Sequence, residues 1–283
     1  MNKNLKLDKT SIHKFQNLVL HFYHSYGKKF PWRQTHDPYH IMVSELMLQQ
    51  TQTERVVQKY LSFIKRFPTV HELAEATVSH ILEEWKGLGY NRRALYLQRA
   101  AQEIIEKYEG VLPSDPDTLR MLPGIGIYTS KAISVFAFNQ PEILMETNIR
   151  TVYIHHFFSG TRKISDNEIE PVVTKTLYKK NPRIWYSALM DYGSYLKKQL
   201  KNINERSKTY RKQSPFKNSD REIRGKVLEK LLENEFVSGS EMEKNICSDK
   251  KRLYRILSDL NKEGFIQESN QAYSLKKENH IKK

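Results

Sequence analysis

Leu122-Pro123-Gly124-Ile125-Gly126 (LPGIG) is the stretch that decides how this sequence folds. It separates two helical patterns, at about 115–121 and 128–138. The two glycines let the backbone approach another surface closely, and they leave the amides of the second helix's first turn available to an anion. The stretch is therefore either an ordinary corner between helices or a hairpin that binds phosphate.

The charge of the chain favours phosphate. The 283 residues include 47 Lys and Arg against 32 Asp and Glu, a formal net charge of +15, and the sequence pI is near 9.6. Such an excess is typical of proteins that bind nucleic acid, and a generally basic protein without a polyanionic partner is the alternative. The apolar fraction of 39% supports a hydrophobic core.

The cellular compartment is predicted from three kinds of sequence feature: a signal peptide, a membrane-spanning run and cysteines. Residues 1–9 are polar and contain no signal-peptide core, and no apolar run reaches membrane-spanning length. Cys247 is the single cysteine, so it allows no internal disulfide and no zinc or iron–sulfur site built from cysteines. We expect a cytoplasmic protein without a membrane partner.

Helical periodicity dominates residues 1–200. Amphipathic segments recur from 11–26 to 183–197, glycine or proline follows many of them, and no stretch alternates as an internal strand would. The sequence predicts an all-α domain of about ten helices here.

The C-terminal part has a different composition. Residues 201–219 are predicted to be a basic, loosely ordered linker, either bound to DNA or merely solvated. Residues 220–276 predict helices at 222–233 and 240–246, a third helix capped by Ser248, and strands at 265–268 and 272–275. This pattern resembles a winged helix-turn-helix, and a basic tail follows at 277–283. Its recognition helix would present to DNA the side chains of Lys250, Lys251, Arg252 and Arg255. A protein-binding module is the alternative.

Two carboxylates attract attention because of their surroundings. A helix opened by Asp37 and Pro38 is expected to carry Glu45 in an apolar run, and to extend through Gln49-Gln50. Partial burial there would raise the pKa of the Glu45 carboxyl and suit a general acid, while a salt-bridged glutamate is the alternative. Glu146 either caps the helix that follows it or stabilises a developing positive charge. One protonated and one ionised carboxyl form the pair that breaks glycosidic bonds.

Several short segments occur in the order and spacing of a known family. PWR (31–33), SELMLQQTQ (44–52), GLGY (87–90), LPGIGIYT (122–129) and MDYG (190–193) resemble the helix-hairpin-helix DNA glycosylases, and among them the MutY-type adenine glycosylases. The likeness covers about residues 30–193. It implies a two-lobed helical fold and, in base-excision repair, removal of adenine paired with 8-oxoguanine or guanine.

The resemblance implies a catalytic role for three residues. Glu45 would protonate the flipped adenine and start N-glycosidic cleavage, and Glu146 would stabilise the oxocarbenium-like sugar. Tyr128 stands where the bifunctional branch has a nucleophilic lysine, and a phenol cannot form a Schiff base. A monofunctional enzyme is therefore expected, although Lys131 lies one turn further on.

The resemblance also implies which residues contact a double-stranded DNA substrate. Gln49 and Gln50 would enter the duplex near the lesion, and Tyr90 would wedge beside the orphaned base. Backbone amides of the opening stretch would bind a phosphate, with or without a monovalent cation, through Leu122, Gly124, Ile125 and Gly126. The expected assembly is a monomer associated with the nucleoid.

Three departures from the family pattern change these expectations. Glu146 replaces an aspartate, and its extra methylene moves the charge by roughly a bond length, a shift that can cost a hundredfold in rate. The four cluster cysteines are absent, with Lys197 at the place of the first, so no iron–sulfur cofactor is expected. No Nudix-like domain is visible, and the winged-helix candidate occupies its place.

Two other functions fit the same residues. A glycosylase for thymine or uracil mispaired with guanine would share tyrosine at the position of Tyr128, whereas the Gln49-Gln50 pair favours adenine. A non-catalytic DNA-binding protein on the same scaffold is the second alternative, and the retained Glu45 argues against it.

Overall fold

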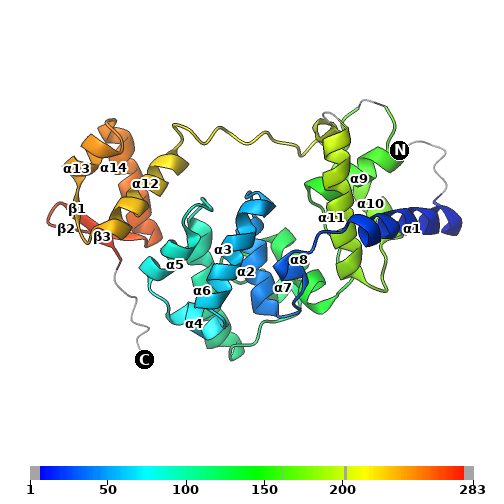
Figure 1. The fold of residues 1–283 in the computed structure, drawn as a ribbon, viewed down its shortest axis with the longest axis horizontal. Coiled ribbons are helices and arrows are strands. Elements are labelled where there is room, and N and C mark those ends of the chain that lie inside the picture. The colour runs from blue at the N-terminus through cyan, green and yellow to red at the C-terminus, as the bar shows by residue number, and fades with distance from the viewer. Residues whose placement is uncertain (1–6, 161, 201–202, 277–283) are drawn as a thin grey trace. The chain divides into compact units, whose positions relative to one another are not determined.

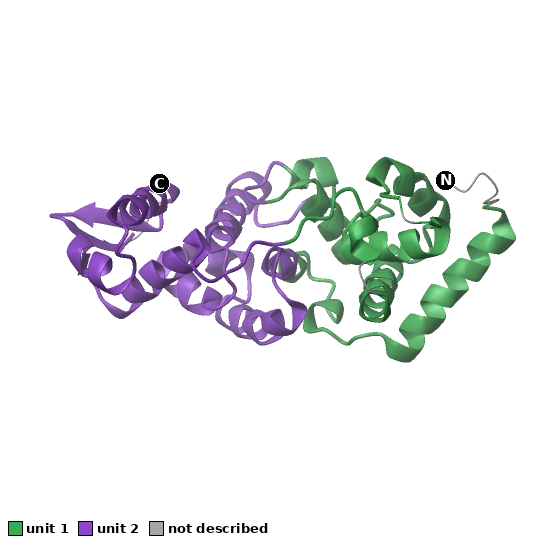
Figure 2. Cartoon of the chain, turned by 90° about the horizontal axis from the view of Figure 1, so that it is seen from above, with its two compact units in different colours: residues 1–41, 114–120, 125–212 green, residues 42–113, 121–124, 213–283 purple. Residues whose placement is uncertain are grey.

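The computed structural model describes residues 7–160, 162–200 and 203–276. These residues form fourteen α-helices, two short 3-10 helices and three β-strands (Figure 1). The chain folds into two compact units (Figure 2). Unit 1 consists of residues 1–41, 114–120 and 125–212, and unit 2 consists of residues 42–113, 121–124 and 213–283. Each unit therefore combines segments that lie far apart in the sequence.

Helices make up the regular structure of the first 200 residues, within the described ranges. They are α1 (Lys9–Tyr26), α2 (Pro38–Leu48), α3 (Thr53–Arg66), α4 (Val70–Glu75), α5 (Val78–Trp85), α6 (Arg92–Tyr108), α7 (Pro116–Leu119), α8 (Ile127–Phe138), α9 (Thr147–Phe157), α10 (Asp166–Thr176) and α11 (Pro182–Gln199), with a 3-10 turn at Pro31–Arg33. Capping residues fix many of the ends. Asp37 Oδ1, for example, accepts a hydrogen bond from the amide of His40 at 3.0 Å. The all-helical prediction for this region is confirmed.

One helix ends earlier than the sequence predicts. α2 stops at Leu48, so Gln49 and Gln50 lie in a turn instead of on the helix, and Gln50 adopts a left-handed backbone with φ 54°. The guanidinium of Arg93 takes the carbonyl oxygens of Leu46, Met47 and Gln49 as acceptors, at 2.7, 2.9 and 2.6 Å. A side chain more than forty positions away thus satisfies the carbonyls at this helix end, and no local pattern could have predicted it.

Each unit has its own packed interior. In unit 1, α1, α9 and α11 meet through aromatic side chains, with the ring of Phe15 5.6 Å from that of Tyr153 and 5.8 Å from that of Trp185. In unit 2, α4 and α6 pack together, and Leu73 and Leu97 are fully buried. No helix in the described ranges is both long and apolar enough to cross a membrane.

The C-terminal segment forms three helices and a small sheet. Its elements are α12 (Asp220–Glu233), β1 (Val237–Ser238), α13 (Gly239–Asn245), α14 (Lys250–Glu263), β2 (Ile266–Ser269) and β3 (Ala272–Leu275). The three helices and the hairpin were predicted, whereas β1 is too short to give an alternating signal. The sheet order is β1-β3-β2, and both pairs are antiparallel. Asp249 caps α14 in place of the predicted Ser248, because its carboxylate accepts from the amide of Arg252 at 3.1 Å.

Part of the segment predicted to be a linker contacts unit 1. Residues 203–206 form a 3-10 turn with Ile203 buried, and the amide of Ile164 donates to the carbonyl of Arg206 at 2.7 Å. The burial of Ile203 and the backbone hydrogen bonds to Ile164 together hold this part of the segment in unit 1. Residues 208–217, by contrast, are exposed. The basic tail at 277–283 lies outside the described residues.

Candidate functional site

Glu45 lies near the C-terminal end of α2, in unit 2. Its carboxyl-bearing side chain is half-buried, and its neighbours Ser44 and Leu46 are fully buried, as are Met42 and Met47. The partial burial predicted for Glu45 is confirmed. A half-buried carboxyl among apolar side chains is suited to the role of a general acid.

Arg93, at the start of α6, holds this helix end through hydrogen bonds, and its role was not predicted from the sequence. Besides the three carbonyls at the end of α2, its guanidinium donates to the hydroxyl of Thr51 at 3.1 Å and to the carbonyl of Gly89 at 2.8 Å. Burial lowers the pKa of Arg93 to about 10, so the side chain stays charged at neutral pH. Its position four residues before the buried Leu97 was the available signal, because charged residues are seldom placed on the buried face of a helix without partners.

The GLGY turn holds Tyr90 in an unusual conformation. Tyr90 has a positive φ of 48°, and Gly87 and Gly89 precede it with φ of 90° and 70°. A Cβ on either glycine would meet nothing within 4 Å, so backbone conformation, not space, requires glycine here. Arg93 fixes the turn from inside through the carbonyls of Gly89 and Tyr90.

Several predicted DNA contacts share one cavity, which lies within unit 2. The cavity has a volume of about 1050 Å³, and its lining includes Gln49, Gln50, Tyr90, Gly124 and Arg255. The lining also includes further basic side chains, namely Arg55, Lys86, Arg92, Arg93, Arg221, Arg224 and Lys226. Four acidic residues line it as well, namely Asp220, Glu222, Glu229 and Asp259. The excess of basic over acidic side chains suits a polyanion. Glu45 belongs to the same unit, while Tyr128 and Glu146 belong to unit 1.

The LPGIG stretch is a turn that the side chain of Tyr96 approaches closely. Gly124 has φ 77°, and a Cβ there would lie 2.6 Å from the Cβ of Tyr96, so the position admits only glycine. Leu122 and Ile125 are buried and anchor the turn. Gly126 is the N-cap of α8 and offers no side-chain cap. A glycine at this cap position lets another group approach the start of α8 closely, as binding of an anion there requires.

Glu146 is the N-cap of α9 in unit 1. Its Oε1 accepts from the amides of Asn148 and Ile149 at 2.8 and 2.9 Å, so the capping role considered for it is confirmed. Burial raises the pKa of the Glu146 carboxyl, and the two backbone hydrogen bonds and the charges of Arg150 and Lys197 oppose the rise. A capping carboxylate of this kind is held in one orientation and keeps an anionic form available.

Gly193 of the MDYG segment supports the same helix start. A Cβ on Gly193 would lie 2.1 Å from the carbonyl oxygen of Asn148, so α11 can contact the first turn of α9 only through a glycine. Asp191 of this segment, buried, pairs with Arg33 of the PWR segment at 2.7 Å. These two distant motifs are therefore joined by one ion pair.

Tyr128 and Lys131 both lie on α8. Tyr128 is half-buried in the first turn of the helix. The ammonium of Lys131 is 3.7 Å from a carboxylate oxygen of Glu142, so the two side chains form an ion pair.

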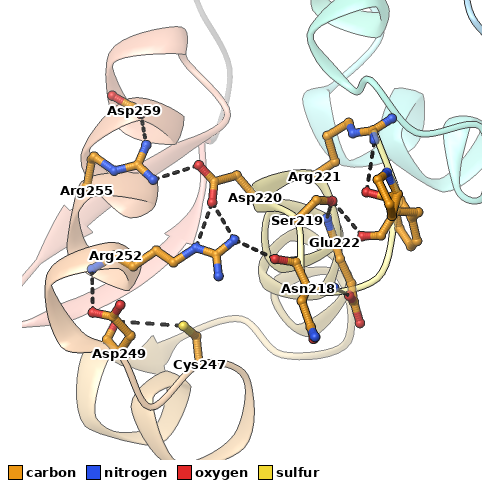
Figure 3. A network of polar contacts seen from close by, with 12 residues as sticks. Asn218, Ser219, Asp220, Arg221, Glu222, Cys247, Asp249, Arg252, Arg255 and Asp259 are labelled. Atoms are coloured by element: carbon orange, nitrogen blue, oxygen red, sulfur yellow. Dashed lines mark hydrogen bonds and ion pairs between the residues drawn. The ribbon is translucent and has the colours of Figure 1, made fainter. Parts of the chain in front are cut away.

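The predicted recognition helix α14 carries basic residues that already have partners. Figure 3 shows Arg252 and Arg255 both directed at Asp220, at 2.7 and 2.6 Å. Lys250 pairs with Glu243 at 2.9 Å, and among the described residues no carboxylate pairs with Lys251. Contact with DNA through the paired residues would exchange carboxylate partners for phosphates.

The donor set for an iron–sulfur cluster is missing. A cluster of the family's type needs four thiolates, and Cys247 is the chain's single cysteine. Lys197, at the place of the first expected ligand, lies on α11 and supplies an ammonium. The residues present therefore do not fit such a cluster.

Comparisons with known proteins agree with this geometry. Residues 43–176 match the HhH-GPD family model, described as HhH-GPD superfamily base excision DNA repair protein. The chain is similar to an adenine DNA glycosylase of Buchnera aphidicola subsp. Baizongia pistaciae, with 35% identity over 64% of this chain and 52% of that protein. It is 29% identical to an adenine DNA glycosylase of Mycolicibacterium smegmatis, over 89% and 92% of the two chains. A thymine/uracil-DNA glycosylase of Pyrobaculum aerophilum is 33% identical over 53% of this chain and 66% of that protein. The chain thus spans about half the length of the first of these relatives.

Solved structures give the same fold. A thermostable thymine-DNA glycosylase superimposes with a TM-score of 0.60 and 27% identity, over 66% of this chain and 88% of that one. A trapped endonuclease III–DNA covalent intermediate superimposes with a TM-score of 0.57 at 21% identity, over 67% and 87% of the two chains, a likeness of fold alone. The residues matched by the family model include Glu45, the hairpin and Glu146. Sequence, fold and motif positions agree, and residues 43–176 of the chain belong to the HhH-GPD superfamily of base excision DNA repair proteins.

Proposed function

We propose that the protein is a monofunctional DNA glycosylase that hydrolyses the N-glycosidic bond of an adenine mispaired with 8-oxoguanine or guanine. The observation that carries the proposal is the half-buried Glu45, set among fully buried neighbours on α2 within the matched family segment. Relatives similar to this chain are named adenine DNA glycosylases.

The reaction follows from the two carboxyls. Glu45 donates a proton to the base, which weakens the glycosidic bond, and acid–base assistance of this kind contributes roughly a hundred- to ten-thousandfold. Glu146, in its ionised form, stabilises the positive charge that develops on the sugar. Water then attacks the sugar carbon, and Glu45, having lost its proton, accepts one from this water.

Binding and base flipping need the basic surfaces. The hairpin amides hold a phosphate of double-stranded DNA, while Gln49, Gln50 and Tyr90 occupy the space left when the base leaves the stack. The C-terminal segment, with three helices and a terminal hairpin, acts as a winged helix-turn-helix-like domain that adds a second DNA contact through α14. Binding therefore weakens steeply as salt rises.

The decisive experiment uses Glu45→Gln, which keeps the shape of the side chain and removes its acid. Duplexes carrying each mismatch are incubated with the protein, and abasic sites are measured after alkali. Wild-type protein is expected to cleave at adenine opposite 8-oxoguanine or guanine, and Glu45→Gln is expected to bind the same duplex without cleaving it. Glu75→Gln, at an exposed position at the end of α4, is the matched control. Equal turnover by Glu45→Gln would exclude this role for Glu45.

A second function is favoured by two comparisons. The thermostable thymine-DNA glycosylase superimposes on this chain with a TM-score of 0.60. The thymine/uracil-DNA glycosylase is 33% identical to it in sequence. The same mismatch panel separates the candidates. Release of thymine or uracil opposite guanine, with adenine left intact, would assign the second function, and binding without any cleavage would assign a non-catalytic protein.

A further inference from the structure

Tyr90 is held by two residues from a part of the chain outside the family match. Its hydroxyl oxygen accepts hydrogen bonds from Gln213 Nε2 and from Arg221 Nη1, each at 2.6 Å. The Arg221 guanidinium also lies 5.0 Å from the centre of the Tyr90 ring. The family match ends at residue 176, so neither Gln213 nor Arg221 takes a role from it.

Arg221 is itself fixed by several bonds. Its Nη2 donates to the carbonyl oxygen of Ser214 at 2.7 Å and to the Ser214 hydroxyl at 3.1 Å. Figure 3 shows this side chain directed away from the Asp220 cluster that holds Arg252 and Arg255. The guanidinium that contacts Tyr90 is therefore a rigid group, not a freely moving surface side chain.

The backbone of Tyr90 is fixed separately by Arg93. Arg93 Nε donates to the Tyr90 carbonyl at 3.3 Å, and the Arg93 guanidinium is 5.5 Å from the Tyr90 ring centre. Two arginines thus act on one tyrosine, one from inside the GLGY turn and one from α12. The first holds the backbone of the turn, and the second holds the ring and, through it, adds to the order of the turn.

The helix that carries Arg221 is anchored in unit 2. Glu263 at the end of α14 is ion-paired with Arg92 and with Arg224. Leu82 and Leu95 belong to the same buried apolar cluster as the cores of α12 and α14. Ion pairs and apolar packing together hold α12 against the elements that flank the Tyr90 turn.

We propose that Arg221 and Gln213 are positioning residues that keep Tyr90 oriented for contact with DNA, so that the C-terminal segment takes part in mispair discrimination through Tyr90. The inference rests on the proposed function, in which Tyr90 contacts the duplex. A tyrosine already held in one rotamer loses little conformational entropy when it binds, whereas a free one must be ordered at that moment. The entropy that is saved corresponds to roughly three- to tenfold higher affinity for the mispaired duplex.

The test uses full-length Arg221→Ala, Tyr90→Phe and the double variant. Tyr90→Phe keeps the ring and removes the hydroxyl that both donors use. Lys230→Ala is the matched control, because it removes one positive charge from the same helix, where Lys230 pairs with Glu241. Thermal unfolding of each variant verifies that the fold is retained.

The first measurement needs no activity. Amide hydrogen exchange is followed in the free protein over residues 86–91. We expect Arg221→Ala and Tyr90→Phe each to increase exchange severalfold, the double variant to add little, and Lys230→Ala to match wild type. Unchanged exchange in Arg221→Ala, or fully additive effects, would overturn the proposal.

The second measurement compares affinities for mispaired and correctly paired duplexes by fluorescence anisotropy. Arg221→Ala is expected to lose on the order of three- to tenfold in this ratio, while Lys230→Ala keeps the wild-type ratio. A turn that loosens while discrimination stays intact would refute the inference. If the turn loosens and discrimination falls, but wild type cleaves no mismatch, the positioning stands and the proposed enzymatic function fails.

Discussion

The guanidinium of Arg93 donates to the carbonyl oxygen of Gln49 at 2.6 Å, across 44 positions of sequence. Other bonds from the same group reach the carbonyl of Gly89 and the hydroxyl of Thr51. One buried cation thus joins the turn after Glu45 to the turn that carries Tyr90. Both turns would lose the buried donor to their carbonyl and hydroxyl oxygens if the guanidinium were removed.

Arg93→Ala is expected to destabilise the protein by about 3 kcal/mol or more, because several buried carbonyls lose their donor at once. Arg93→Lys should recover only part of this loss, since an ammonium cannot reproduce the planar arrangement of donors. Urea unfolding measures both. Arg92→Lys, at the neighbouring and more exposed position, is the control for charge on α6. A loss under 1 kcal/mol in Arg93→Ala would contradict the bracing role.

Glu146→Gln should preserve the helix cap, since an amide oxygen can still accept from the two backbone amides. It removes the negative charge, so the cleavage rate is expected to fall on the order of a hundredfold. The raised pKa of Glu146 also predicts that the wild-type rate rises with pH through a range above the ordinary carboxyl value, as the ionised form accumulates. Single-turnover rates between pH 4.5 and 8 would reveal this rise, and Glu146→Gln should lack it. Identical pH profiles would remove Glu146 from the reaction.

Gly193→Ala is expected to destabilise the protein by about 1–3 kcal/mol, because the new methyl group would lie 2.1 Å from a backbone oxygen of α9. Gly225→Ala provides the contrast. It lies within α12, where a Cβ meets nothing within 4 Å, so the same substitution should stabilise by roughly 0.5–1 kcal/mol. Thermal unfolding measures the expected loss of stability in Gly193→Ala and the expected gain in Gly225→Ala. If Gly193→Ala unfolds like wild type, the close approach of α11 to α9 is not essential.

Borohydride should trap no covalent protein–DNA complex during cleavage. Tyr128 cannot form a Schiff base, and Lys131 is ion-paired with Glu142. A shifted band on a denaturing gel, lost in Lys131→Ala, would instead identify a lyase activity at Lys131.

Stability should fall as the solution becomes acidic, in part because of His156. Burial lowers the pKa of His156 to about 4, and the charge of His155 acts in the same direction. An unfolded histidine binds a proton below about pH 6.5. The contribution of His156 to the free energy of unfolding is therefore fully present above that pH, and it is lost as the pH falls toward 4. Because the side chain is partly exposed, solvent screening reduces this contribution to about 1–2 kcal/mol.

Urea unfolding at pH 7.5 and pH 5 measures this difference. His156→Gln should reduce it, while His21→Gln, at an exposed position on α1, should leave it unchanged. A difference that persists in His156→Gln would place the acid sensitivity elsewhere.

Local chemistry explains how far the sequence alone could go. Asp37 with Pro38, and Asp115 with Pro116, mark helix starts through oxygens and a fixed φ that act within four residues. The half-burial of Glu45 followed from its apolar neighbours, and the need for glycine at 124 followed from a turn between two helices. The capping role of Glu146 could also be predicted from the sequence, because a cap involves amides only two and three positions away.

Other features depend on atoms that only folding brings together. α2 stops at Leu48 because a guanidinium on α6 takes its last carbonyls. Gly193 is required because α11 meets the carbonyl of Asn148. Arg221 reaches the hydroxyl of Tyr90 across 131 positions, from a segment whose own pattern predicts nothing about that turn. Propensity and periodicity report interactions within a few residues, so the sequence determined the helices, the hairpin and the acidic residues. Hydrogen bonds and steric contacts between distant segments carry no local signal, and only the tertiary structure decided which residues brace the turns around the candidate site.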